Sequence, residues 1–221
     1  MNRGSLRHTW RCVIPAVAAL GLLLALSGVA AADPPSRFGD GLGDAEEGAP
    51  AWVLPVAHNA GLLLLVRAGC SALWPDYFDI TEVNDNARIF SRSWSEPPTF
   101  DLNQAPFEWD HDPWTINVIG HGLMWSESYL VYRRSGYAWW HSLLMTTAWS
   151  FAWEYLVEAW HKHPSGIDLI WSPVAGGLLG EGRYQLLRLI RSMDPAAGRN
   201  VLLYLIDPLG QLERDALGLA F

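Results

Sequence analysis

Seven polar residues interrupt some of the most apolar, tryptophan-rich sequence of the chain. They are Asn117, His121, Ser150, Glu154, Glu158, Asp168 and Glu181. Burying an ionised carboxylate without a partner costs several kcal/mol or forces its pKa to shift, so each group should be paired, neutralised or functional. The stretch is therefore the place of a candidate site, although these residues alone do not name a reaction.

Ser150, Glu154 and Glu158 repeat at the spacing of one α-helical turn. At about 100° per residue their side chains fall on one face, with the two carboxylates stacked one turn apart. In a low-dielectric site one carboxylate would take a raised pKa, which is how an acid and a base arise from the same residue type. The alternative is that Glu158 lies at the solvated end of the helix near Lys162 and only Glu154 is buried.

Asn117 and His121 share one face of the preceding apolar stretch. The tight connection 133–136, Arg-Arg-Ser-Gly, makes the two helices antiparallel neighbours, so His121 should lie level with Glu154 and Glu158. An imidazole that faces a carboxylate suits general acid and base chemistry. The alternative is a core histidine that a carboxylate holds for structural reasons alone.

A metal site here would need a further ligand. One histidine with two glutamates is a small ligand set unless Asp168 or Glu181 joins it, so we assign no metal and leave cofactors open. Asp168 follows Ser165 in a helix-capping pattern, which favours a structural role for both. Glu181 follows the G-x-x-x-G face 176–180, and it is either buried beside that face or paired with Arg183.

Ser150 is a candidate nucleophile, with His121 as the base and Glu154 as the residue that orients the base. Mid-helix serines usually bond instead to the carbonyl one turn earlier, and the chain has no G-x-S-x-G elbow. We keep His121, Glu154, Glu158 and Ser150 as candidate catalytic residues. The candidate ligand-binding residues are Asn117, Trp125, Trp153, Ser165, Asp168 and Glu181.

Apolar runs, turn residues and capping residues predict the elements that position these side chains. We expect helices over 52–66, 114–132, 137–160 and 172–193, with a last packing segment over 201–206. Ser172 and Pro173 offer an N-cap followed by proline at the first helical position. Residues 71–113 are rich in Pro, Asp and Asn, so we expect an irregular acidic connection there, which is a candidate surface for a protein partner.

Residues 1–32 have the features of a secretory signal: a basic start, an apolar run and alanines at 30–32. An uncleaved anchor is the alternative. We expect residues 33–50 to form a flexible acidic leader rich in Gly and Pro, and residues 211–221 to form a C-terminal tail. Removing the signal's three arginines changes the net charge from −8 to −11 and leaves Cys70 as the single cysteine. We expect an exported protein of the periplasm or the cell-envelope membrane.

The charge and the tryptophans bear on partners. The acidic balance and the lack of a basic stripe exclude nucleic acid as an expected partner. Nine of the 13 tryptophans fall between Trp109 and Trp171, which suits helix ends at a membrane interface, with a soluble aromatic core as the alternative. Membrane lipid or an envelope component is therefore the expected partner.

Several sequence elements recur in the order of one bacterial family. They are Asn117 and His121; Tyr132, Arg134 and Gly136; Ser150, Trp153-Glu154-Tyr155 and Glu158; Pro164-Ser165 and Asp168; and Pro173, Gly176 and Gly180-Glu181. Over about residues 110–210 the chain resembles the uncharacterised bacterial family domain of unknown function 3943, although Gly122 stands where that family tends to have proline. The resemblance implies an exported envelope protein and brings no activity with it.

We therefore expect a mostly α-helical, compact bundle of three to five helices that is membrane-associated. Its core domain spans 114–210, after a first helix and irregular segment over 51–113. Trp125 and Trp153 should line the site and the turn 164–168 should close it. The expected role is structural or the binding of a lipid-like ligand. The alternative is a membrane-associated hydrolase of lipid or envelope material, with His and Glu as acid and base.

Overall fold

The computed structural model describes residues 52–73, 83–194 and 197–218. The α-helices in these ranges are α2 (Val53–Leu73), α3 (Val83–Ser93), α4 (His121–Arg134), α5 (Trp139–Ala152), α6 (Asp168–Arg191), α7 (Ala197–Ile206) and α8 (Pro208–Leu217). The mostly α-helical class is confirmed. The expected count of three to five helices is wrong, because these ranges contain seven α-helices. The expected signal and leader lie outside the described residues.

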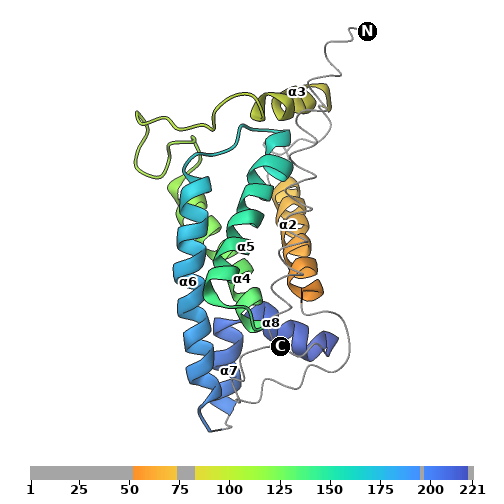
Figure 1. The fold of residues 1–221 in the computed structure, drawn as a ribbon, viewed down its shortest axis with the longest axis vertical. Coiled ribbons are helices and arrows are strands. Elements are labelled where there is room, and N and C mark those ends of the chain that lie inside the picture. The colour runs from red at the N-terminus through yellow and green to blue at the C-terminus, as the bar shows by residue number, and fades with distance from the viewer. Residues whose placement is uncertain (1–51, 74–82, 195–196, 219–221) are drawn as a thin grey trace.

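Helices α4, α5 and α6 run side by side along the long axis of the molecule, and each packs against the other two (Figure 1). Helix α2 packs against α4, and α3 lies across the end of the bundle where it contacts the segment that follows α5. Helices α7 and α8 lie at the opposite end. The candidate site is therefore built inside a three-helix core rather than on a loop.

The turn between α4 and α5 has the tight geometry that the sequence predicts. Gly136 takes a φ of 87°, in the left-handed region that favours glycine. The Ser135 amide donates to the carbonyl of Val131, and the Gly136 amide donates to that of Arg133. This short connection makes α4 and α5 antiparallel neighbours.

Helices α4 and α6 approach closely because glycines lie between them. A Cβ added at Gly176 would lie 2.7 Å from the Cβ of Trp125, and one at Gly180 would lie 2.6 Å from the Cδ1 of Tyr129. Real Cβ atoms do not come so close, so only glycine allows this separation. The G-x-x-x-G face is thus a packing face, and α4 lies against it.

Helix α6 begins earlier than the sequence predicts. Its first residue is Asp168, so Pro173 lies inside the helix and the expected start at Ser172 is wrong. The reason is that Ser165 caps the chain first: its hydroxyl accepts from the Asp168 amide at 3.1 Å, and its carbonyl accepts from the Leu169 amide. Ser172 therefore faces the bundle interior from within α6, fully buried.

The acidic connection is more regular than expected. Helix α2 continues to Leu73, and α3 occupies Val83–Ser93, so of the described part of 71–113 only the residues after α3 are largely irregular. Thr99 forms an isolated parallel bridge with Ser165, which ties this segment to the turn before α6. Helix α8 covers most of the expected C-terminal tail.

Candidate functional site

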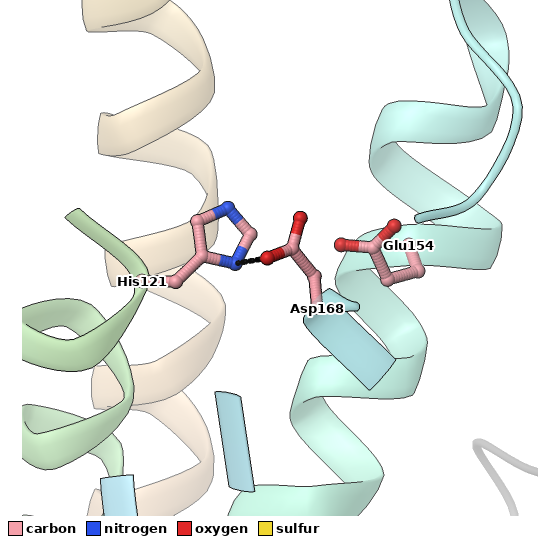
Figure 2. A group of neighbouring side chains, drawn as sticks. All are labelled: His121, Glu154 and Asp168. Carbon is pink, nitrogen blue, oxygen red and sulfur yellow. Dashed lines mark ion pairs between the residues drawn. The ribbon is translucent and has the colours of Figure 1, made fainter. Parts of the chain in front are cut away.

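The ends of three elements bring His121, Glu154 and Asp168 together, and we call these residues the His–Glu–Asp cluster. His121 begins α4, Glu154 lies in the segment that continues α5, and Asp168 begins α6. One ligand atom from each residue lies within 4.8 Å of the others. Figure 2 shows the imidazole and the two carboxylates directed toward one another, with Asp168 in the middle.

Two π-helical segments supply the backbone around this cluster. Thr115–Gly120 leads into His121 and contains Asn117, whereas Trp153–Val157 contains Glu154. A π-helical turn adds a residue to the normal helical repeat, and such turns occur frequently at functional sites. They also rotate the side chains that follow, so the regular spacing of 100° per residue does not hold through 153–160.

His121 is buried and electrically neutral. Its Nδ1 lies 3.0 Å from the hydroxyl of Ser172 and 3.5 Å from the Oδ1 of Asp168. Burial lowers the pKa of the imidazole to about 4, although the carboxylates of Glu158 and Asp110 oppose this. At neutral pH the ring therefore has one nitrogen lone pair available for a proton or a cation.

Glu154 is fully buried, and only one of its two carboxylate oxygens accepts a hydrogen bond. Its Oε2 accepts from the Ser165 amide at 2.7 Å, while its Oε1 has no hydrogen-bond partner among the described residues. Burial, together with the nearby carboxylates of Glu158 and Asp168, raises the pKa of Glu154 well above its usual value. The raised pKa favours the neutral, protonated form of this side chain.

Asp168 has the fewest side-chain hydrogen bonds of the three cluster residues. It is fully buried, and within the described part of the chain neither of its carboxylate oxygens has a hydrogen-bond partner of ordinary geometry. Burial and the charges of Asp110 and Glu158, opposed by Lys162, together raise its pKa to about 8. Its backbone amide donates to the Ser165 hydroxyl, so Asp168 takes part in the helix cap and also lies in the candidate site.

Lys162 and its acidic partners form the other side of the site. Its Nζ lies 3.3 Å from Glu158 and 3.6 Å from Asp110, and it also pairs with Asp112. Burial opposes the ionisation of Glu158, but Lys162, His121 and His161 outweigh it and lower the pKa of Glu158. Glu154 and Glu158 thus have pKa values that move in opposite directions, although the π-helical and 3-10 segments between and after them replace the regular α-helix expected over 153–160.

Asn117 belongs to the acidic side of the site. Its side-chain amide donates to Asp110 at 2.7 Å and to the carbonyl of Phe107 at 2.8 Å. Trp153 also lies there, because its indole N–H donates to Glu158 at 3.1 Å. Asn117 and Trp153 therefore position the carboxylates around Lys162 rather than His121.

Three other predicted residues lie elsewhere or make no such contact. Ser150 is buried, but its hydroxyl has no hydrogen-bond partner among the described residues, so no hydrogen bond joins it to His121. Trp125 is fully buried against Gly176. Glu181 pairs with Arg133 at 2.9 Å and accepts from Tyr129, outside the cluster.

Sequence reasoning missed Asp110, Lys162 and Ser172 as members of this region. In the sequence, Lys162 has the features of a cation at a helix C-terminus, and Asp110 is one of many acids in its segment. Ser172 has the features of an N-cap. One sequence signal could have identified Lys162: the segment 71–113 contains many acids, and few cations lie near the apolar stretch against which these acids must pack. Lys162 is the lysine among the histidines that follow Trp160, and it meets those acids.

A second buried polar group lies near the other end of α4. Arg134 donates to both oxygens of Asp207, at 2.6 and 2.8 Å, and both side chains are fully buried. Glu127 joins this group through Arg183 at 2.6 Å. Because each charge here has an opposite partner, this group has the composition of a structural ion-pair network.

The His–Glu–Asp cluster can therefore do three kinds of chemistry. A neutral imidazole beside carboxyl groups with raised pKa values can transfer protons. The same groups can bind a polar ligand or hold a cation, because one nitrogen and several oxygens face one point. A third possibility is a purely structural hydrogen-bonding role between α4 and α6.

Comparison with known proteins gives one match. Residues 106–209 match the family model described as a domain of unknown function, DUF3943, and this range contains the whole cluster. No curated protein and no solved structure matches the chain.

Proposed function

We propose that this chain, which belongs to the DUF3943 family through its residues 106–209, is an exported protein of the bacterial cell envelope. It associates with a membrane through apolar side chains on its outer surface. Its buried polar site holds the helices in register or binds a lipid-like ligand.

One observation carries this proposal: polar side chains lie inside the bundle and large apolar side chains lie on its surface, the reverse of the usual arrangement in a soluble bundle. Asn117, Glu154 and Asp168 are fully buried, whereas Ile170 is 62% exposed and Leu178 is 72% exposed. Soluble proteins rarely bury carboxylates while leaving an extended apolar surface in water. A lipid environment explains both features together.

Helix α6 shows the inversion most clearly. Ile170, Val174 and Leu178 follow one another at steps of four residues, and all three are exposed. The inner face carries polar and small residues instead, among them Ser172 and Gly176. Small residues toward neighbouring helices and large apolar residues outward are the arrangement found in membrane bundles.

The segment before α4 extends the same surface. Ile116, Ile119 and Leu123 are exposed at steps of three and four residues. Gly122 contacts α6, since a Cβ there would lie 3.4 Å from the Cδ1 of Leu179. The two exposed rows therefore adjoin. Within the described residues, α2 is the one helix whose length and composition would let it cross a membrane.

A hollow beside the polar site supports a lipid-like ligand. It has a volume of about 380 Å³ and is lined by Arg67, Val83, Asn86, Leu156, Val157 and Trp160. This volume is within the range of small-molecule sites. Arg67 contacts His161 at 3.3 Å, which links the hollow to the residues around Glu158. Apolar walls with a guanidinium suit an acyl chain with an anionic end.

The alternative is a membrane-associated hydrolase, and the favouring observation is the pair of proton-transfer groups. His121 is neutral at neutral pH, and the pKa of Glu154 is raised. A base and an acid are thus available in one buried place. Ser150 makes no hydrogen bond to His121, so this alternative relies on an activated water rather than on a serine nucleophile.

The test of membrane association is a fluorescence-quenching measurement. The full chain carries Cys12→Ser, Cys70→Ser and one new cysteine, at Leu178→Cys or Leu102→Cys. This cysteine is labelled with bimane, and the protein is reconstituted with lipids brominated in their acyl chains. We expect strong quenching at position 178 and little at position 102, which is equally exposed but lies in the acidic segment. Equal, weak quenching at both positions would overturn the proposal, as would release of the native protein from envelope membranes by alkaline carbonate.

A further inference from the structure

We propose that His121, Glu154 and Asp168 form a binding site for one divalent transition-metal cation of the zinc class. The site joins the starts of α4 and α6 to the end of α5. It goes beyond the proposed function and does not depend on membrane association, because all three residues lie inside the bundle.

The geometry is that of a ligand set brought together by the fold. The three residues are distant in the chain, yet their ligand atoms all lie within 4.8 Å of one another. Among the described residues this is the one group of three or more His, Cys, Asp or Glu that comes so close. Side chains from three separate elements do not converge in this way through helical spacing alone.

Unpartnered atoms point to something that occupies the centre. Both oxygens of Asp168 and the Oε1 of Glu154 lack a hydrogen-bond partner of ordinary geometry in the described part of the chain, although both residues are fully buried and His121 lies 3.5 Å from one Asp168 oxygen. Buried polar atoms of native proteins are almost always bonded, and an unbonded carboxylate is particularly costly. These three oxygens border the cluster, where a cation would satisfy them together.

The balance of charge supports a cation rather than an anion. Glu154, Asp168, Glu158 and Asp110 are four buried carboxylates, and Lys162 is the cation that pairs with two of them. Lys162 forms its ion pairs with Asp110, Asp112 and Glu158 and acts on Glu154 and Asp168 only from farther away, so these two carboxylates have no adjacent lysine or arginine among the described residues. A divalent cation would neutralise both carboxylates at once.

The donor atoms select the class of ion. One imidazole nitrogen with two carboxylates suits zinc and its neighbours, whereas calcium and magnesium prefer all-oxygen sites. Three protein ligands would leave a position for water or substrate. Ligands at about 2.1 Å in a tetrahedral site lie about 3.4 Å apart, so the side chains must move inward by roughly 1 Å or less.

Ser172 assists the imidazole without being a ligand. Its hydroxyl lies 3.0 Å from the Nδ1 of His121, which is also the nitrogen closer to Asp168. The hydroxyl can turn away when a cation takes the lone pair of that nitrogen, because a serine O–H rotates freely. Ser172→Ala is therefore a useful variant, since it leaves all three ligands in place.

The test is a calorimetric titration of Zn²⁺ into the chelator-treated full chain, with folding checked by circular dichroism. We expect one ion per chain. Asp168→Asn and Glu154→Gln should weaken binding by roughly 10-fold or more, since each removes a ligand charge. The matched control is Glu181→Gln, a carboxylate paired with Arg133 outside the cluster, which should bind as the wild type does. Ser172→Ala keeps all three ligands and should weaken binding less than the ligand variants do.

A second measurement uses protein with all three ligand residues intact, so its result does not depend on whether the ligand variants fold. Co²⁺ bound to the protein with Cys12→Ser and Cys70→Ser should give the visible absorption of a low-coordinate nitrogen and oxygen site. A folded wild type that binds no Zn²⁺ would overturn the proposal. Unchanged affinity in folded Asp168→Asn, or a Co²⁺ spectrum typical of the hexaaqua ion, would do the same. Quenching at position 178 is unaffected by any of these results, so failure here and failure of membrane association are separable.

Discussion

The Nδ1 of His121 lies 3.5 Å from the Oδ1 of Asp168, where the starts of α4 and α6 meet. Both side chains are buried, and the contact depends on how closely the two helices approach. That approach is set by Gly176 and Gly180 against Trp125 and Tyr129. Helix packing and the candidate site are thus parts of one structure, and both can be tested.

Gly176→Ala should destabilise the protein. The new Cβ would lie 2.9 Å from the backbone carbonyl carbon and oxygen of Trp125, which cannot move as a side chain can. We expect a loss of about 1–3 kcal/mol in the free energy of unfolding, measured by denaturant titration. The control is Gly182→Ala in the same helix, where nothing lies within 4 Å of the added Cβ. The control should be neutral or slightly stabilising, and equal losses in both variants would contradict the packing account.

Asp207→Asn should break the second buried polar group. Arg134 would then keep a fully buried charge without its closest partner, at a cost of roughly 3–5 kcal/mol. Thermal unfolding measures this cost. Asp85→Asn is the control because Asp85 pairs with Arg88 on the surface, where both side chains are largely exposed. We expect little change in that variant, and a similarly small effect of Asp207→Asn would show that the buried pair is not needed.

Glu154→Gln and Glu158→Gln should have different effects in the metal-free protein at pH 7. Burial raises the pKa of Glu154 and so favours its neutral form, which a glutamine resembles, and this change should therefore cost less. Glu158 is ionised beside Lys162, so Glu158→Gln should cost roughly 1–3 kcal/mol in the free energy of unfolding. Denaturant titration with a chelator present distinguishes them. A larger loss for Glu154→Gln than for Glu158→Gln would contradict the assigned charges.

His161 should contribute to loss of stability in acid. Burial, with Arg67 and Lys162 nearby and Glu158 opposing, lowers its pKa to about 4 in the folded protein. An unfolded histidine titrates near 6.5, so the unfolded state binds the proton first as pH falls. The contribution is therefore complete above about pH 6.5 and is lost between there and pH 4, by up to about 3 kcal/mol.

His161→Gln should flatten this part of the stability profile, measured as the free energy of unfolding from pH 7 to pH 4. His111→Gln serves as the control, because its side chain is 56% exposed, and it should follow the wild type. A profile for His161→Gln that has the wild-type slope would show that the burial of this imidazole does not govern acid stability.

Much of the fold follows from local rules. Apolar runs and the Arg-Arg-Ser-Gly turn predict α4 and α5 as antiparallel neighbours, and the structure places His121 and Glu154 in one cluster. Gly176 and Gly180 indicate close packing without saying which helix they contact. Predicting Trp125 and Tyr129 as the partners requires the relative rotation of α4 and α6, which no local pattern contains.

Other parts depend on competition between local signals or on distant contacts. Ser165 and Ser172 both have the features of an N-cap, and Ser165 caps the helix because Glu154 also accepts from its amide. Lys162 meets Asp110 only after the acidic segment has folded back, since these residues are far apart in sequence. The π-helical turns at Asn117 and Glu154 follow from packing and have no simple sequence signal.

The zinc K-edge X-ray absorption spectrum of the zinc-loaded full chain tests the central claim most directly. The account predicts nitrogen and oxygen neighbours at about 2.0–2.2 Å from the ion. It also predicts an imidazole outer-atom signal that disappears in His121→Gln and persists in His161→Gln. Sulfur at about 2.3 Å, which would indicate a cysteine ligand, or an imidazole signal unchanged in His121→Gln, would contradict a zinc site built from His121, Glu154 and Asp168.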